Sequence, residues 1–258
     1  MKVRLQMMIQ DPRFAPVHGA KRRIEGYDVT NEHFCNGPAT ERVVVVDRDA
    51  DSGQVVAGAK FLAAKGRRVL GKFDLPHPKD IDVESRTFNQ VSVMATVLKT
   101  IALYEESDVL GRPIRWNFDG PKLTVIPRMG EEENAYYKRD LKRLEFYYFR
   151  GRVDSNQVVY TSLSRDIVGH ETGHAILNGI APQLLNGETA TWQSLGLHET
   201  IGDITGLLIS IDSPNLRKEV LAKTMGSIED ATNFSAFGEQ WGMVNGEGAL
   251  RNLRNTRK

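Results

Sequence analysis

The chain has 258 residues, 40% of them hydrophobic, so it can bury a sizeable core in one large domain or two small ones. Its 34 basic and 33 acidic residues leave a net charge of +1, which gives no reason to expect nucleic acid or an anionic membrane as a partner. No apolar run reaches the roughly 18 residues that a membrane-spanning helix needs. We therefore expect a soluble protein that binds neither nucleic acid nor membrane.

The cysteine content and the first residues bear on location. The single cysteine, Cys35, excludes an internal disulfide, so nothing demands an oxidising compartment. Near the N-terminus Gln6, Gln10 and Asp11 interrupt a short apolar patch before a signal-peptide core can form. We expect no secretion signal, and a cytoplasmic setting is compatible with the sequence. Nothing in it indicates an oligomeric state.

The first part of the chain predicts a lead-in followed by strands. Residues 1–38 show no clean period, and we assign no element there. Residues 42–47 contain four consecutive valines, and a second β-rich run covers residues 54–63 after a turn rich in Asp and Gly. These two runs predict a hairpin. A third strand is predicted for residues 68–73.

A long helix is predicted after Ser85, because apolar residues recur there at helical spacing. They are Phe88, Val91, Met94, Ala95, Leu98, Ile101 and Ala102. The helix should end near Gly111 and bury this stripe in the core. Short strands are predicted for residues 123–126 and 158–161, and the pattern of residues 136–150 is ambiguous.

Two further helices carry the chemistry of the sequence. The first should begin between residues 164 and 166, where a serine or an aspartate can accept hydrogen bonds from free amides, and end near Gly179. The second should cover residues 188–211 and stop at Pro214. Both helices contain residues of the types that bind metals.

The first of them contains an H-E-x-x-H motif, formed by His170, Glu171 and His174. Residues four apart lie one above the other on a helix, so the two imidazoles can reach one ion while the glutamate sits beside it. Neutral imidazole is a good zinc ligand, and the carboxylate is placed to take a proton from water. By chance the motif arises in about one of a hundred such sequences. The alternative is a pair of hydrogen-bonded helix histidines.

The second helix offers a further ligand. Glu199 can complete a set of two histidines and one glutamate, and Asp203, four residues on, can accept the outer N–H of a ligand histidine. The alternative, an exposed acidic stripe, is disfavoured because the helix is otherwise largely apolar and buried carboxylates need a cation. Glycines at 196, 202 and 206 would let it pack closely against the first helix.

These residues resemble the thermolysin family of zinc peptidases, the gluzincins, in which H-E-x-x-H is followed on the next helix by a ligand Glu and, four residues on, an Asp. The run Asn134-Ala135-Tyr136-Tyr137 is similar to the family's edge segment, which aligns the substrate peptide. Residues 166–169 resemble the run that leads into the motif. The likeness covers residues 134–209, with fainter similarity from residue 91 onward and at 249–253.

The resemblance implies an α+β fold with a β-rich N-terminal lobe packed on zinc-binding helices in a thermolysin-like core. It divides the chain into a lead-in and β-rich segment at 1–84 and a catalytic domain at 85–258, whose C-terminal lobe is truncated or absent. It also implies hydrolysis of a peptide or protein substrate with zinc as cofactor. Glu171 would be the general base. Asn134, Ala135 and Tyr136 would bind the substrate.

The sequence departs from the family in the groups that stabilise the oxyanion. No tyrosine lies between His174 and Glu199, and no histidine follows His198. Loss of one such group typically lowers the rate by two to three orders of magnitude. The alternative is therefore a zinc-containing, weakly active or inactive peptide-binding protein, or a fragment. His198 replaces the family's Asn; it can orient a ligand histidine, join the metal ligands or do neither, and we favour the first.

Calcium is the second ion that the resemblance raises. Asp166 stands at a position that ligates calcium in some relatives. The sequence shows no later acidic cluster that would complete such a site, so a calcium site stays unsupported. A cap at the start of the helix is at least as good an explanation for this aspartate.

Overall fold

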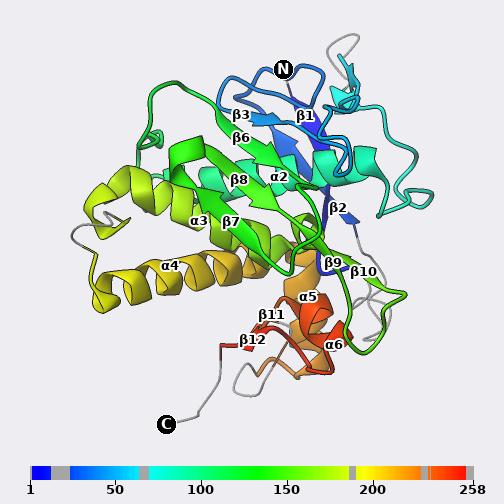
Figure 1. Ribbon diagram of the computed structural model, residues 1–258, viewed down its shortest axis with the longest axis vertical. Helices are drawn as coiled ribbons and strands as arrows, with labels where there is room; N and C mark the ends of the chain where they lie inside the picture. Colours follow the sequence, from blue (N-terminus) through cyan, green and yellow to red (C-terminus); the bar gives the residue numbers. More distant parts are fainter. Residues whose placement is uncertain are drawn as a thin grey trace.

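The computed structural model describes residues 2–12, 24–63, 70–185, 190–227, 232 and 234–253. Small sheets and helices alternate along this chain, so the expected α+β class is confirmed. Figure 1 shows the helices that were expected to carry the chemistry beneath the main sheet, with the C-terminal segment beside them. Among the described residues no helix is both long and apolar enough to cross a bilayer.

The main sheet has four strands in the order β3-β6-β8-β7. They are β3 (Val43–Val45), β6 (Leu123–Ile126), β8 (Arg143–Phe146) and β7 (Ala135–Lys138). The first three run parallel, whereas β7 pairs antiparallel with β8 and forms one edge of the sheet. An edge strand keeps unpaired backbone groups on its outer side. This matters below, because β7 borders the candidate site.

The predicted hairpin of residues 42–47 and 54–63 is wrong as a ladder. β3 pairs in parallel with the distant β6. Among the described residues the two runs meet only next to the turn, where Arg48 bridges Val55 and the Val56 amide donates to the Asp47 carbonyl. A continuous valine run suits a parallel strand covered on both faces better than a half-exposed hairpin strand. The remainder of the second run forms β4 (Phe61–Leu62), which pairs with β5 (Lys72–Phe73). The start of the predicted strand 68–73 lies outside the described residues.

A two-stranded ribbon lies where no element was expected. β1 (Val3–Met8) pairs antiparallel with β2 (Ile24–Val29). Val3, Leu5 and Met7 are fully buried, and β1 packs on helix α2. Because Met8 is buried as well, the strand lacks the plain alternation that marks a half-exposed strand in a sequence.

Helix α2 (Arg86–Glu105) lies between β5 and β6 in the chain. It starts after Ser85, whose hydroxyl accepts a hydrogen bond from the Phe88 amide. The predicted stripe is buried as far as Ile101, and every residue from Phe88 to Ile101 is buried. The helix ends six residues before the predicted Gly111. Its last side chain, Glu105, accepts hydrogen bonds from Arg42 and from the amide of Ile114, so the chain turns there.

Helices α3 (Arg165–Ile180) and α4 (Trp192–Ile211) confirm the two predicted helices and pack against each other. α4 begins after Thr191, which caps it, and not at the predicted residue 188. A methyl group added at Gly169 would lie 3.2 Å from the Gly206 Cα, so the backbones approach closely there. Gly202 likewise faces α3. Gly196 faces open space, so only two of the three predicted glycines serve helix packing.

The ambiguous residues 136–150 form strands β7, β8 and β9 (Tyr148–Arg150), with the turn η1 (Arg139–Leu141) between the first two. β9 pairs with β10 (Val158–Tyr160), as a strand near 158–161 predicted. The remaining elements are η2 (Thr161–Leu163), η3 (Pro182–Leu185), α5 (Pro214–Lys223), β11 (Ala236–Phe237), α6 (Glu239–Val244) and β12 (Arg251–Asn252). α5 begins at Pro214, where the preceding helix was expected to stop.

The largest buried hydrophobic cluster combines side chains from the start, middle and end of the chain. It includes Leu5, Val43, Val97, Ile176 and Phe237. Residues on both sides of the predicted boundary at 84 and 85 therefore share one core. The division into two domains stays a prediction.

Candidate metal centre

The three residues of the H-E-x-x-H motif lie on the buried side of α3. His170, Glu171 and His174 are 4%, 8% and 8% exposed. α4 brings Glu199 opposite the two histidines, with its side chain 57% exposed. The predicted ligand set thus combines two buried imidazoles with one carboxylate at the rim.

The spacing of the three ligands fits one small ion. His170 Nε2 lies 3.4 Å from one Glu199 oxygen, and His174 Nε2 lies 3.5 Å from the other. All three ligating atoms lie within 4.8 Å of one another. Two atoms bound tetrahedrally to one zinc at about 2.0–2.1 Å are about 3.3 Å apart. The donor set and its spacing therefore fit zinc.

Asp203 occupies the position predicted for it beside a ligand histidine. Its Oδ1 lies 2.9 Å from His170 Nδ1. A proton on Nδ1 leaves the lone pair of Nε2 free for a metal. Burial lowers the pKa of His170, but the hydrogen bonds to Asp203 and Glu199 outweigh burial and raise that pKa to about 9.

His198 contacts the other ligand histidine by stacking. The rings of His174 and His198 are 4.4 Å apart at 29°, and His198 is 3% exposed. His174 Nδ1 and His198 Nε2 are buried, and neither has a hydrogen-bond partner among the described residues. Burial and the charge of His170 lower the pKa of His174 to about 3. Ring stacking with His174 therefore supports the predicted orienting role of His198, whereas no hydrogen bond does.

Glu171 meets the requirements of a general base. Its carboxylate lines the same cleft as the ligands. Burial raises the pKa of Glu171 to about 7, against the opposing effects of the His170 charge and a hydrogen bond from the Tyr137 backbone. A carboxylate with a pKa near neutrality can both accept and return a proton.

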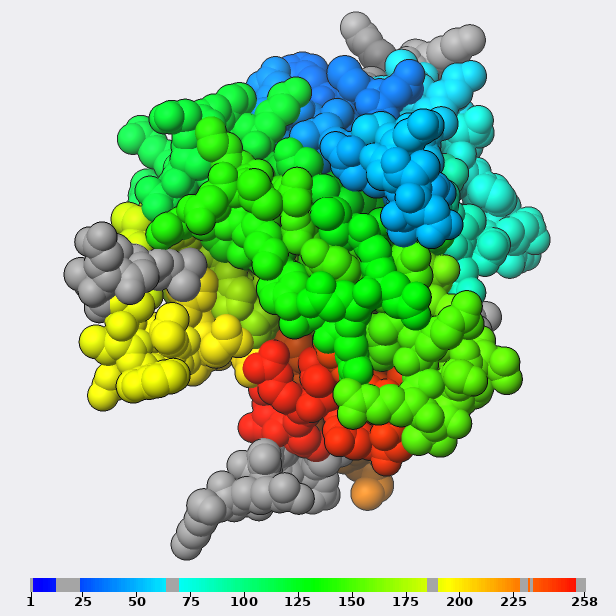
Figure 2. Space-filling view, in the orientation of Figure 1, coloured from blue at the N-terminus to red at the C-terminus, as the bar shows by residue number. Residues whose placement is uncertain are grey.

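The cleft has a volume of about 340 Å³. Its lining residues come from β7 and the residue before it, and from α3, α4 and β12: Asn134, Ala135, Tyr136, Tyr137, His170, Glu171, His174, His198, Glu199 and Arg251. In Figure 2 the surface is hollowed between the yellow start of α4 and the red C-terminal segment. The cleft is large enough for a few residues of an extended peptide.

The three predicted substrate-binding residues all line the cleft, but the Asn134 side chain is engaged locally. Its oxygen accepts a hydrogen bond from the Ala135 amide, and its nitrogen donates to the Tyr136 hydroxyl at 2.7 Å. That hydroxyl donates in turn to Glu132 at 2.5 Å. Asn134 therefore fixes the edge strand more directly than it offers groups to a ligand.

Arg251 is a site residue that sequence reasoning missed. It lies on β12, and its Nη1 is 3.3 Å from Asp203 Oδ2 and 3.9 Å from Glu199 Oε2. Its guanidinium stands 5.1 Å from the centre of the Phe237 ring. The faint family similarity at residues 249–253 was the one indication in the sequence. No periodicity links this arginine to the two helices with the candidate ligands, which lie far earlier in the chain.

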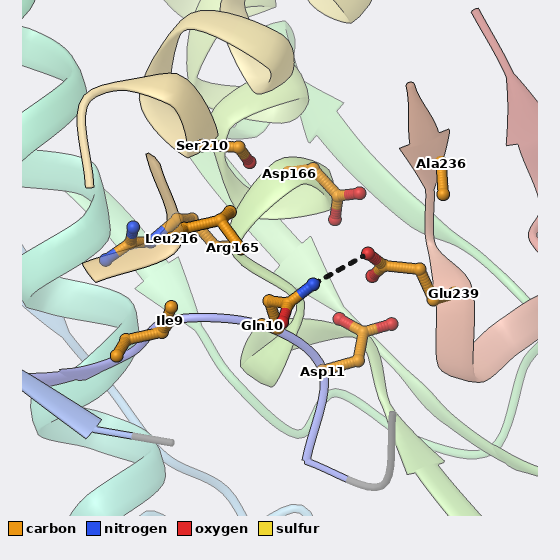
Figure 3. A pocket seen from close by; sticks show the side chains of 9 residues that line it. All are labelled: Ile9, Gln10, Asp11, Arg165, Asp166, Ser210, Leu216, Ala236 and Glu239. Carbon is orange, nitrogen blue, oxygen red and sulfur yellow. Dashed lines mark hydrogen bonds between the residues drawn. The ribbon is translucent and has the colours of Figure 1, made fainter. Parts of the chain in front are cut away.

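Asp166 does more than cap α3. It accepts hydrogen bonds from Ser164, from the Ile167 amide at 2.8 Å and from the Gly238 amide at 2.7 Å. The fold also brings Asp11 and Glu239 to it, from the two ends of the chain (Figure 3). These two carboxylates do not form a run with Asp166 in the sequence, so the sequence could not indicate them. The expectation about calcium stays a prediction.

The chain matches no protein-family model, and no curated protein shows significant similarity to it. The chemistry of the site therefore rests on its geometry. That geometry defines an arrangement of two histidines and one carboxylate suited to a divalent metal, with a second, buried carboxylate beside it.

Proposed function

We propose that this protein is a zinc-dependent peptidase. The observation that carries the proposal is the position of Glu199, whose two oxygens face the Nε2 atoms of His170 and His174 at 3.4 and 3.5 Å. The proposal is supported by Glu171 in the same cleft and by a sheet edge along its border. Peptide hydrolysis by a metal needs a set of metal ligands, a general base and a surface that binds the substrate, for which an edge strand is well suited.

Each part has a role in the proposed reaction. Zinc at this site would act as a Lewis acid and lower the pKa of water. Glu171 takes a proton from the attacking water at its carboxylate and passes it to the leaving amine. β7 would add the substrate as a further antiparallel or parallel strand at the edge of the sheet. The amides of Ala135 and Tyr137 already donate to Asn134 and Glu171, so they would exchange these partners on binding. Arg251 places a cation beside the cleft, where it can stabilise charge that develops on the carbonyl oxygen.

A zinc-containing peptide-binding protein is the second candidate, because the tyrosine hydroxyls nearest the ligands are engaged elsewhere. Tyr136 donates to Glu132, and Tyr137 donates to Asn178. Neither hydroxyl is available for a developing oxyanion as these side chains stand, which leaves Arg251 as the cationic group among the described lining residues. Retention of Glu171 in a buried position favours the enzyme.

The first experiment is the zinc content of freshly purified protein by elemental mass spectrometry, followed by cleavage of a quenched-fluorescence peptide library. We expect about one zinc per chain and measurable cleavage. Glu171→Gln should keep the zinc and abolish cleavage, whereas His174→Ala should lose both. Zinc without cleavage in the native sequence would support the binding protein. Normal cleavage by Glu171→Gln would contradict the assigned base.

A further inference from the structure

Helix α4 has an apolar face that is exposed to solvent. The face that packs on α3 is buried and consists mainly of small and polar residues: His198, Gly202, Thr205, Gly206, Ile209 and Ser210. On another side of the helix, Leu197, Ile204 and Leu208 are 47%, 43% and 42% exposed. Ile201 and Ile211 lie on that same side and are partly buried. A surface helix normally turns polar residues toward water, so this face is unusual.

The five residues of this face follow a heptad pattern. Leu197, Ile201, Ile204, Leu208 and Ile211 are separated by steps of four, three, four and three residues. This period of 3.5 residues is typical of the seam of a coiled coil, whereas an ordinary surface helix has a broader apolar stripe. We call these five residues the α4 seam. From its first residue to its last, the seam is about 22 Å long.

The α4 seam does not overlap with the candidate metal centre. Leu197 precedes Glu199 by two residues, and Ile201 precedes Asp203 by two. Residues two apart on a helix point to nearly opposite sides. No seam residue is among the described residues that line the cleft. A helix bound to the seam would therefore leave the cleft open.

The described part of the chain does not cover the seam. Figure 1 shows α3 lying between α4 and the main sheet, so that α4 is the outer of the two helices. Contiguous apolar patches on the surface of a protein often mark a site of interaction. The spacing of the seam residues indicates that the partner at this site is a helix, whose side chains would fit between them.

The flanks of the seam carry no charge that would select a foreign partner. In coiled coils, charged residues beside the apolar positions choose the partner. On the exposed flank these positions hold Thr200 and Leu207, and on the other flank His198 and Thr205 are buried. Two copies of the seam can therefore face each other without like charges in contact. The net charge of +1 opposes such a pairing only weakly.

We propose that the α4 seam is a dimer interface, at which two copies of this chain pair their α4 helices about a twofold axis. A twofold interface uses the same patch on both copies, and the continuous, uncharged seam allows this. A contact about 22 Å long and about 10 Å wide covers only a few hundred Å² per copy. Stable complexes bury about 800 Å² per partner, so the dimer is weak, with a Kd in the micromolar range.

The test is sedimentation velocity of the full chain at concentrations from about 1 to 100 µM. Reductant is present, so that the exposed Cys35 cannot link two copies. We expect the fraction of dimer to rise over this range. Ile204→Lys should raise the Kd by about tenfold or more, because the lysine would be buried in the apolar interface without a partner. Leu208→Lys, one turn further along the seam, should have the same effect.

Val109→Lys is the matched control. Val109 is 55% exposed and lies outside α4, so the variant replaces an exposed apolar residue by the same lysine and should leave the Kd unchanged. A native chain that stays monomeric at about 100 µM overturns the proposal and would leave the seam to a helix of another protein. Dimers of Ile204→Lys and Leu208→Lys as strong as those of the native chain overturn it as well. Neither result would bear on zinc binding or cleavage.

Discussion

Asp203 Oδ1 lies 2.9 Å from His170 Nδ1, and Arg251 Nη1 donates a hydrogen bond to Asp203 Oδ2 at 3.3 Å. The ligand histidine, the carboxylate and the cation thus form one chain of contacts from the helix interior to the cleft. Because Nδ1 is engaged, Nε2 is directed to the metal position.

Replacing Asp203 by Asn should weaken zinc binding. The amide cannot accept the imidazole proton as strongly, so the ring loses its fixed tautomer, and the affinity should fall by about 10- to 100-fold. Competition with a fluorescent chelator measures this. Asp140→Asn is the matched control and should bind zinc as the native chain does. Equal affinities for all three proteins would show that Asp203 does not orient His170.

Replacing Arg251 by Gln should reduce turnover without removing zinc. The cation is placed to stabilise charge that develops on the substrate, and loss of such a group lowers kcat by about 10²–10³. The kcat of Arg251→Lys should lie between those of the native chain and Arg251→Gln. The measurement is kcat on a cleaved peptide together with zinc content. A loss of zinc with unchanged kcat per bound zinc would instead make Arg251 a support of Asp203.

Two glycines of α4 give a matched pair of variants. A methyl group at Gly202 would lie 2.7 Å from the His170 ring, whereas at Gly196 it would meet nothing within 4 Å. Gly202→Ala should therefore displace His170 and lower the zinc content. Gly196→Ala should raise the free energy of unfolding by about 0.5–1 kcal/mol through helix propensity. If both variants retain zinc equally, the close approach of α4 to His170 is not as described.

The buried acidic cluster of Asp11, Asp166 and Glu239 predicts how stability depends on pH. Burial and the charge of Asp166 raise the pKa of Asp11 from 3.8 to about 7. The folded chain then holds a proton that the unfolded chain has released, so this stabilisation is present at low pH and is lost as the pH rises to about 7. Urea unfolding across that range should show the decline. Asp11→Asn should flatten it, and an unchanged slope would place the titration elsewhere.

The candidate metal ligands could be predicted because each lies in a local pattern. His170, Glu171 and His174 share one helical period, and Glu199 and Asp203 share another. The structure confirms both helices and brings the two patterns together. The contact between α3 and α4 was the one step without a local pattern of its own, and the glycines at 202 and 206 were the indication for it.

The elements that could not be predicted depend on distant contacts. β3 has its partner far along the chain, in residues 123–125, so its valines were interpreted as half of a hairpin. Arg251 and Glu239 reach their sites from the far end of the chain, and Asp11 from the near end. The spacing of residues along the sequence does not indicate which distant segments come into contact.

The pairing of Phe237 with Arg251 across β11 and β12 separates two properties of the cleft. The Phe237 ring packs on His170 with centroids 5.7 Å apart, and the Arg251 guanidinium stands 5.1 Å from the centre of the same ring. Every proposed zinc ligand precedes this hairpin in the chain. A cut between α5 and β11 would therefore leave every proposed zinc ligand on one fragment and both Phe237 and Arg251 on the other. Zinc content and turnover of the separated and recombined fragments would show which of the two properties depends on the hairpin.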